Sequence, residues 1–263
     1  MLLRLTALVH DVGHGFLSHV SERALDRLPT IDGKHTIREL RSEAKEFFSS
    51  LNPPAMGGVL SGLLILLPEW QEVLSVAQIP FWSDAQDLSL RMVRLICGGR
   101  DPRRPFLSEI VSGPLDVDKL DYIPRDCYMA GVPMPVDVDR LMEKIQVVTV
   151  PADRVPAADD YAEETGIDPS DTVEVLTVQT AGSRAFEELV LSRFLLYEKL
   201  YYHQKIRALE GAVVNALEIL ASEHPAFKEI STYLRLSDDE FLLQHLASYR
   251  HPIAAHVRRC ARQ

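Results

Sequence analysis

The chain has 263 residues, 46% of them hydrophobic, and carries a formal net charge of −10. Its length suits one large domain, or one domain with an appended lobe, and its apolar content excludes general disorder. The acidic balance argues against a broad nucleic-acid-binding surface, because such surfaces are basic. It does not exclude a small anionic substrate, since a metal ion and a few local cations can reverse the field inside one pocket.

The cysteines and the apolar runs predict a cytoplasmic protein. Cys97, Cys127 and Cys260 are far apart and form no CxxC pair, so we expect reduced thiols. The apolar run 59–67 is too short to span a bilayer and is interpreted as a buried helix. The apolar start of the chain lacks a cleavage-type site, so neither a signal peptide nor a membrane partner is expected.

Periodic apolar residues predict a succession of helices in the first half of the chain. These helices are expected at 2–10, 16–28, 35–49, 59–66, 69–76, 84–97 and 105–112. Turn residues separate them at Pro29–Lys34, Asn52–Pro54 and Gly98–Pro102. Two further helices are expected, one at 115–130, where Pro124 would introduce a kink, and one at 137–145.

The second half begins with two β-rich runs, 146–150 and 173–179, joined by an acidic, polar stretch that we predict to be a long loop. A long amphipathic helical region is expected at 184–222, followed by short helices at 225–234 and 238–248. The long region has more apolar positions than one helix face needs, including Phe194, Leu195, Tyr197, Leu200 and Tyr201. These side chains either complete the core or form a contact between subunits.

The densest cluster of chemically active side chains is His10-Asp11-Val12-Gly13-His14, followed by His19 and Glu22. Adjacent His and Asp near a helix end can both reach one metal ion, and this donor set suits Mn, Fe, Zn or Ni better than Mg. Ordinary surface or core histidines are the alternative. A zinc-peptidase-like helix, with Asp11 in place of the glutamate of HExxH, is disfavoured because Gly13 interrupts the helix.

A second cluster lies at 116–126. On a helix, Asp118, Tyr122, Arg125 and Asp126 share one face at spacings of three and four. Charges on a helix usually mark a solvated face. Tyr122 and Met129 extend the stripe and suit open solvent poorly, so a pocket wall is the other interpretation. The residues alone leave both open.

Both clusters lie in segments that resemble a known family. HDVGHGFLSHVSE at 10–22 resembles the signature of the HD-domain phosphohydrolases, and SGPLDVDKLDYIPRDCYMAGV at 112–132 resembles the matching downstream motif. The pair is typical of the branch related to the SAM-and-HD-domain triphosphohydrolase. Phe16-Leu17 departs from the usual Pro-Phe, which we interpret as a packing change. A weaker resemblance continues at 196–197 and 201–205.

The resemblance implies a mainly α fold: an HD-domain helical bundle with a small β-hairpin insertion and a C-terminal helical lobe. We expect the catalytic core at 1–145 and the hairpin with the C-terminal helices at 146–263. The resemblance also implies one divalent metal ion (Mn, Fe, Zn, Ni or Mg) with His10, Asp11 and Asp118 as its ligands.

The resemblance also implies roles around the metal. His14 and His19 would line the phosphate site, with His19 as the acid near the scissile bond, and His35 is a further active-site match. Glu22 stands where an aspartate usually orients the catalytic histidine. The residues implied to hold the triphosphate and the sugar are Lys119, Tyr122 and Asp126.

The implied activity is hydrolysis of a dNTP to a deoxynucleoside and triphosphate by a homo-oligomer. The alternatives are hydrolysis of another nucleotide, such as guanosine tetraphosphate, and a catalytically impaired protein that binds nucleotide or oligomerises. An impaired protein is considered because the family has a further metal-ligand histidine upstream. None of the nine residues before His10 is a histidine. We therefore expect an N-terminally incomplete sequence whose own turnover is low.

Overall fold

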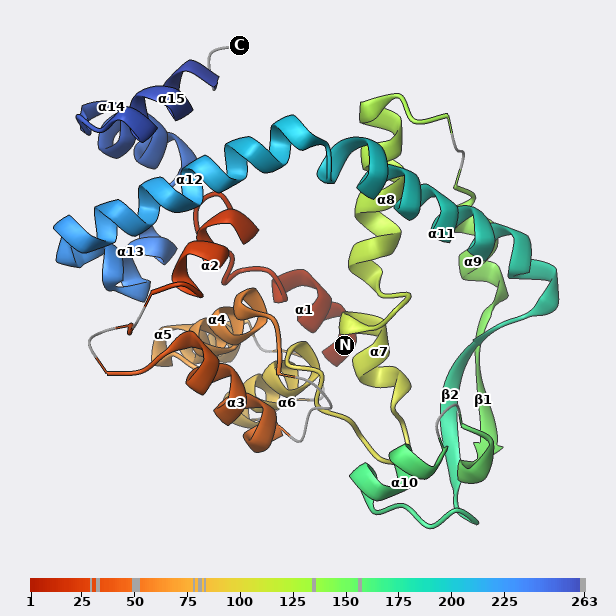
Figure 1. The fold of residues 1–263 in the computed structure, drawn as a ribbon. Helices are drawn as coiled ribbons and strands as arrows, with labels where there is room; N and C mark the ends of the chain where they lie inside the picture. Colours follow the sequence, from red (N-terminus) through yellow and green to blue (C-terminus); the bar gives the residue numbers. More distant parts are fainter. Residues whose placement is uncertain are drawn as a thin grey trace.

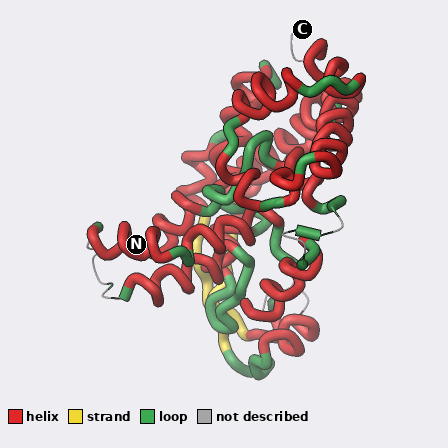
Figure 2. The backbone as a smooth tube through the Cα atoms, turned by 90° about the vertical axis from the view of Figure 1, so that its left-hand side faces the viewer, coloured by secondary structure: helices red, strands yellow, loops and turns green. Residues whose placement is uncertain are grey.

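Helices form most of the structure, a computed structural model, and the described residues contain one two-stranded sheet (Figures 1 and 2). The described residues are 1–28, 30, 31, 34–48, 53–77, 79, 82, 84–133, 136–155 and 158–260. The mainly α fold expected from the sequence is confirmed.

Among the described residues, seven α-helices precede the second motif. They are α1 (Leu2–Val9), α2 (His19–Leu25), α3 (Ile37–Phe48), α4 (Met56–Ile65), α5 (Pro68–Val76), α6 (Ala85–Ile96) and α7 (Phe106–Ser112). Caps explain several of these boundaries. The Asp84 side chain accepts from the amides of Gln86 and Asp87 to begin α6. Thr36 and Glu39 form a reciprocal capping box at the start of α3.

The second motif forms α8 (Val117–Ala130), which continues through Pro124 and is followed by α9 (Val138–Lys144). Asp116 begins α8 by accepting from the amide of Lys119 at 2.9 Å. The chain then forms the hairpin, α11 (Ser183–Leu196), a π-helical turn (Tyr197–Tyr201) and α12 (Gln204–Glu223). The last helical elements are η4 (Pro225–Lys228), α13 (Ile230–Arg235), the π-helical η5 (Glu240–His245), α14 (Leu246–Ser248) and α15 (Pro252–Cys260).

The sheet is an antiparallel pair of β1 (Ile145–Pro151) and β2 (Thr172–Val178), in the register Ile145 opposite Val178. Both predicted β runs are therefore present. The connection is not the loop that the polar composition predicted, because it contains the short turn Ala152–Arg154 and α10 (Ala158–Thr165). Tyr161 of α10 is buried and donates to the carbonyl of Pro102, so a tertiary contact orders this segment.

Two other predicted helices have different bounds in the structure. The helix expected at 16–28 is limited to α2, because Leu17 and Ser18 have positive φ and cannot continue a right-handed helix. The region expected as one helical stretch at 184–222 is divided at Tyr202 and His203 into α11 with its π turn and α12. Parts of the predicted turns and of the helix end at 49 lie outside the described residues: Pro29, Asp32, Gly33, Ser49 and Asn52.

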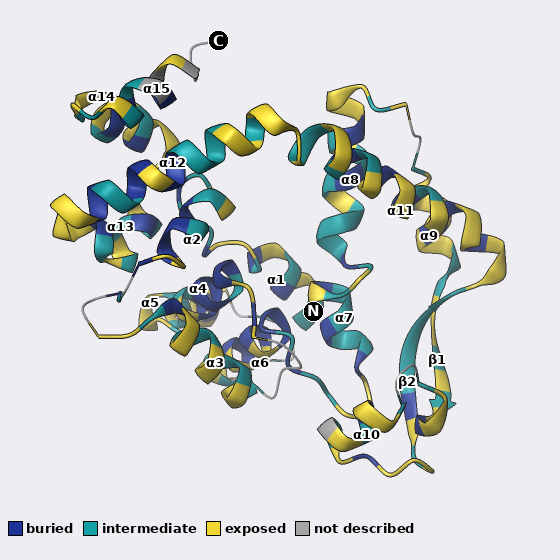
Figure 3. Ribbon diagram, viewed as in Figure 1, coloured by how far each residue is buried: buried dark blue, intermediate teal, exposed yellow. Residues whose placement is uncertain are grey.

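Several apolar clusters hold these elements together. Their buried residues are dark blue in Figure 3. One cluster joins α2 and α4 to α12 and the C-terminal helices, with Leu25, Leu60 and Leu217 at its centre. A second joins α1 to α5, α6 and α7, and a third joins α8 to α9 and α11. The first motif therefore lies where two clusters meet. The division of the chain at residue 145 stays a prediction, since the first cluster draws on both sides of it.

No single helix in the described part of the chain is long and apolar enough to cross a membrane. By length and composition alone α4 and α5 could do so together, with a bend of 64° between them.

Candidate metal and phosphate site

The loop between α1 and α2 carries the first motif, and close packing against α4 fixes its course. The Gly13 amide donates to Ser61 Oγ at 2.9 Å. A Cβ at Gly13 would lie 2.0 Å from the Ser61 nitrogen, so only glycine allows this approach. The loop thus passes directly from His10 and Asp11 at the end of α1 to His14 over the first turn of α4.

His10, Asp11 and Asp118 form a group with metal-binding geometry. Each offers one ligand atom, and these atoms lie within 4.8 Å of one another. His10 Nδ1 lies 2.7 Å from the carbonyl oxygen of Ala7, which can only accept, so in the neutral ring the proton is placed on Nδ1 and the Nε2 lone pair is left free. Nε2 is buried, lies 3.2 Å from Asp11 Oδ2 and makes no hydrogen bond to any described residue.

The carboxylates in and beside this group repel one another, and a bound cation would offset this repulsion. Burial raises the pKa of the Asp118 carboxyl, and the neighbouring carboxylates of Asp11 and Asp116 raise it further. The contact with Asp11 raises the pKa of His10, and contacts with His10 and His14 hold the pKa of Asp11 far below its usual range. A buried imidazole nitrogen that makes no hydrogen bond, together with two close carboxylates, fits one divalent metal ion.

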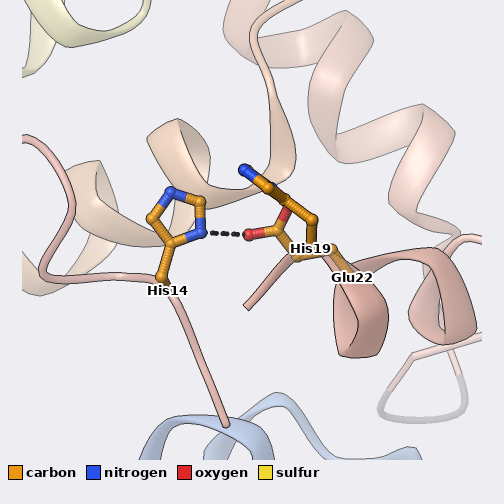
Figure 4. Close-up of side chains that lie close together, drawn as sticks. All are labelled: His14, His19 and Glu22. Carbon is orange, nitrogen blue, oxygen red and sulfur yellow. Dashed lines mark hydrogen bonds and ion pairs between the residues drawn. The ribbon is translucent and has the colours of Figure 1, made fainter. Parts of the chain in front are cut away.

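A second group consists of His14, Glu22 and His19 (Figure 4). Asp11 connects it to the first group. Glu22 accepts at both oxygens, from His14 Nδ1 at 2.5 Å and from His19 Nδ1 at 3.1 Å. His14 Nε2 lies 3.1 Å from Asp11 Oδ1. The glutamate therefore spans both histidines despite being longer than the usual aspartate.

Hydrogen bonding strongly shifts the titration of this second group. Contacts with Asp11 and then Glu22 raise the pKa of His14 to about 10. Burial would raise the pKa of Glu22, but its bonds to His14 and His19 outweigh burial and lower the pKa to about 2. Glu22 and His14 are mostly enclosed, whereas the His19 side chain is 75% exposed. His19 therefore lies at the open side, where a substrate can reach it.

The second group could also hold a metal ion. Its three side chains, however, already satisfy one another, because the Nδ1 atoms of both histidines bond Glu22. In the first group, His10 Nε2 is buried and makes no hydrogen bond within the described part of the chain, with the Asp11 carboxylate 3.2 Å away. The donor set of His10, Asp11 and Asp118 therefore fits a metal ion better than the set of His14, Glu22 and His19 does.

We expect Glu22→Gln to lower the pKa of His14 in the metal-free protein. Protonated His14 should stabilise the fold fully below its ordinary pKa of 6.5, and this stabilisation should be lost as the pH rises through about 10. Ionised Glu22 should stabilise the fold above its ordinary pKa of 4.5, and its effect should be lost as the pH falls towards about 2. Glutamine keeps the shape but removes the charge, so both effects should shrink.

NMR titration of the His14 ring in the presence of a chelator measures this pKa directly. Glu218→Gln, which removes a surface ion pair with Arg27, is the control and should leave His14 unchanged. An unchanged pKa of His14 in Glu22→Gln would refute the pairing.

The second motif supplies a side wall from α8. Tyr122 and Asp126 face α11 and the π turn, where the Tyr201 hydroxyl donates to Asp126 Oδ2. Burial, and then Tyr197, raise the pKa of Tyr122 to about 12. On the exposed side, Arg125 pairs with Asp121 at 2.6 Å. The helix thus packs against α11 and the π turn on one side and has a solvated face on the other, where Met129 is also exposed.

Arg193 is a residue that sequence reasoning missed. It lies on α11 with its guanidinium carbon 5.4 Å from the centre of the Tyr197 ring. Burial opposes its charge, but hydrogen bonds to Tyr197 and Tyr122 raise its pKa. Its position depends on the packing of α11 on α8, for which one sequence carries no signal. Arg193 and Lys119 both line a cavity of about 290 Å³ between these helices.

Lys119 does not point freely at this site. Its ammonium group pairs with the buried carboxylate of Asp116 and donates to the Gly113 carbonyl at 3.0 Å. Contact with a phosphate would require the Lys119 ammonium group to leave or share Asp116.

His35 lies outside both groups. It is exposed in the turn before α3, where its backbone pairs with Ile31. Active-site roles for Lys119 and His35 stay predictions.

Known proteins resemble the chain in sequence and in fold, although no protein-family model matches it. It is 30% identical over 155 residues to the human deoxynucleoside triphosphate triphosphohydrolase SAMHD1, which covers 57% of this chain and 24% of that protein. It is 24% identical over 240 residues to the SAMHD1 homolog of Dictyostelium discoideum, covering 90% of this chain and 35% of that protein. The chain thus spans about a third or less of these relatives.

A solved phosphohydrolase from Bacteroides thetaiotaomicron has the same fold. Its TM-score is 0.59 at 18% identity, covering 97% of this chain and 56% of that one. The two motifs, the helical fold and these sequence relatives make this chain similar to the HD-domain phosphohydrolases, including SAMHD1.

Proposed function

We propose that this chain is a metal-dependent hydrolase of nucleotides, and that its substrates are dNTPs, cleaved to a deoxynucleoside and inorganic triphosphate. One observation carries the proposal. The metal-type group of His10, Asp11 and Asp118 shares Asp11 with the network of His14, Glu22 and His19. A cation site and a proton-handling site are therefore adjacent, as hydrolysis of a phosphate ester requires.

A bound divalent ion would neutralise charge on the phosphate and activate the attacking water. His19 is the more accessible of the two histidines in this network, and its Nδ1 is bonded to Glu22, so when the ring is protonated its other nitrogen could give a proton to the leaving oxygen. The contacts of His14 with Asp11 and Glu22 raise its pKa, so a protonated ring could donate a hydrogen bond towards the phosphates.

The wall of α8 and α11 suits the rest of a nucleotide. Tyr122, Asp126 and Tyr201 offer hydroxyl and carboxylate groups for a sugar, and Arg193 offers a guanidinium for a phosphate. The adjoining cavity is lined by apolar side chains, including Ile123 and Phe194, that could pack against a base. These assignments remain proposals for each residue.

The test is an assay of the purified chain with each dNTP and with guanosine tetraphosphate. Mn, Fe, Zn, Ni and Mg are added in turn, and triphosphate is detected by ion chromatography. We expect triphosphate and a deoxynucleoside in equal amounts, formed at low turnover. Diphosphate from guanosine tetraphosphate alone would replace the dNTP assignment. Bound metal and nucleotide without turnover would establish the non-hydrolytic alternative.

We further propose that the chain forms a homo-oligomer through α11. Several large apolar residues on this helix are exposed, and Leu191 is the one that lies outside the cavity assigned to the nucleotide. Of the residues singled out by sequence, Leu200 and Tyr201 instead pack against the α8 cluster. Sedimentation with and without dNTP should show an oligomer that Leu191→Glu weakens. A monomer at micromolar concentration under both conditions would contradict it.

A further inference from the structure

We propose that Asp238 is a positioning residue for His19, acting by holding the strained turn that precedes α2. The inference rests on the proposed function only for the role of His19 in catalysis. The geometry that carries it involves the loop residues Phe16, Leu17 and Ser18, and residues 233–241 from the far end of the chain.

The turn before His19 is held in an unfavourable conformation. Leu17 has φ 54° and Ser18 has φ 45°, and no other non-glycine residue in the described ranges has a positive φ. Side chains with a Cβ seldom adopt this region, and such residues persist only where surrounding contacts fix them. Leucine gains nothing locally from this conformation, so the fixing contact must come from elsewhere.

That contact comes from Asp238. Its Oδ1 accepts a hydrogen bond from the Leu17 amide at 2.7 Å. The residue before Leu17 is held by the same region. The Phe16 amide donates to the Tyr233 carbonyl at 3.3 Å, and the Phe16 ring stacks on Phe241 at 4.6 Å. The C-terminal region thus forms hydrogen bonds with two consecutive residues of the loop, Phe16 and Leu17.

The Asp238 carboxylate is itself placed by a cap. The Ser237 amide donates to Glu240 Oε2 at 2.9 Å, and the Glu240 amide donates to Ser237 Oγ at 3.2 Å. This reciprocal arrangement is a capping box, which fixes the backbone on both sides of Asp238. The acceptor is therefore oriented before Leu17 contacts it.

The turn decides where His19 lies. Ser18 is the N-cap of α2, and its carbonyl accepts from the Ser21 hydroxyl at 3.0 Å and from the Glu22 amide at 3.3 Å. His19 and Glu22 occupy this first turn of α2. If Leu17 and Ser18 relaxed to ordinary φ, α2 would start in a different direction. His19 would then shift relative to His14, which comes from the loop before the turn.

The experiment compares Asp238→Ala with Asp239→Ala. Asp239 is the neighbouring exposed carboxylate, and the described structure gives it no contact with the loop. Because Asp238 is exposed, its removal should leave the fold intact. We expect kcat to fall on the order of tenfold to a hundredfold, the cost of a displaced catalytic group, with bound metal and KM little changed. Asp239→Ala should behave as the parent.

A readout that needs no turnover separates this inference from the proposed function. In histidine-labelled protein, Asp238→Ala should shift the ring signals of His19 and leave those of His224 in place. Asp238→Asn keeps an acceptor oxygen at the same position, so it should restore most of the parent spectrum and, if the chain is a hydrolase, most of its turnover. Unchanged His19 signals in Asp238→Ala would overturn the proposal even in an inactive protein.

A second variant tests the strain itself. Glycine adopts positive φ without a Cβ clash, so Leu17→Gly in the Asp238→Ala background should return the His19 signals towards the parent. Leu17→Ala in the same background removes the same packing without relieving the strain, and it should not. If both double variants behave alike, the contact of Asp238 is structural only, and the proposed positioning role is wrong.

Discussion

Asp118→Asn should abolish stoichiometric metal binding while leaving the metal-free protein as stable as the parent or more so. Asparagine keeps the size of the side chain but lacks the negative charge with which Asp118 would bind the ion beside His10 and Asp11. Turnover should fall by at least about a hundredfold, the loss typical of a single charge-stabilising group. Metal content measures the first effect, and thermal unfolding with and without metal measures the second.

The gain in metal-free stability follows from the electrostatics. Burial, then Asp11 and Asp116, raise the pKa of Asp118, so ionisation of this group opposes folding above its pKa. An amide removes that cost. It also removes a carboxylate from the first turn of α8, where the helix dipole favours negative charge, and this offsets part of the gain. Added metal should then raise Tm in the parent and not in the variant.

Asp121→Asn is the matched control. Asp121 lies on the same helix, but its carboxylate is exposed and pairs with Arg125. Metal content and turnover should remain those of the parent, since surface pairs contribute little. If Asp118→Asn retained full metal content, the ligand set would have to be redrawn around His14, Glu22 and His19.

The sequence could predict those parts of the molecule that depend on local pattern. Alternating β-branched residues predicted both strands of the hairpin, and periodic apolar residues predicted most of the helices. The chemical character of the first motif was also apparent, because histidine, aspartate and glycine at that spacing are uncommon outside a site. His10, Asp11 and Asp118 do meet in the structure, although their function remains a proposal.

The rest depended on contacts between distant segments. Local composition at 16–28 favours a helix. Contacts of Tyr233, Phe241 and Asp238 with the loop hold the positive φ angles that shorten this helix. The polar stretch around Tyr161 looks like a loop until its hydroxyl meets the Pro102 carbonyl. Arg193 reaches Tyr122 only because α11 packs across α8 (Figure 1).

Gly57→Ala should destabilise the protein and displace His14, although alanine favours helices. Gly57 lies in the first turn of α4, directly beneath the His14 ring. A Cβ there would lie 2.3 Å from His14 Cε1 and 2.7 Å from both ring nitrogens. The ring cannot turn aside cheaply, because its nitrogens are bonded to Glu22 and Asp11. Either these bonds break or α4 moves away from the loop.

The neighbouring glycine provides the control. A Cβ at Gly58 would lie 3.5 Å from the Ile96 side chain, which is ordinary contact. Gly58→Ala should therefore be neutral or stabilising, by up to about 1 kcal/mol from helix propensity. Gly57→Ala should instead lower the free energy of unfolding by about 1–3 kcal/mol, the usual cost of overpacking.

Urea unfolding of the two variants measures the difference in sign, and the NMR signals of His14 report whether the ring has moved. Turnover should fall on the order of a hundredfold in Gly57→Ala, since His14 would lose its contacts with both Asp11 and Glu22. It should stay unchanged in Gly58→Ala. If both substitutions stabilised the protein equally and left His14 in place, the ring would not lie over α4, and the proton-handling network could not be built on it.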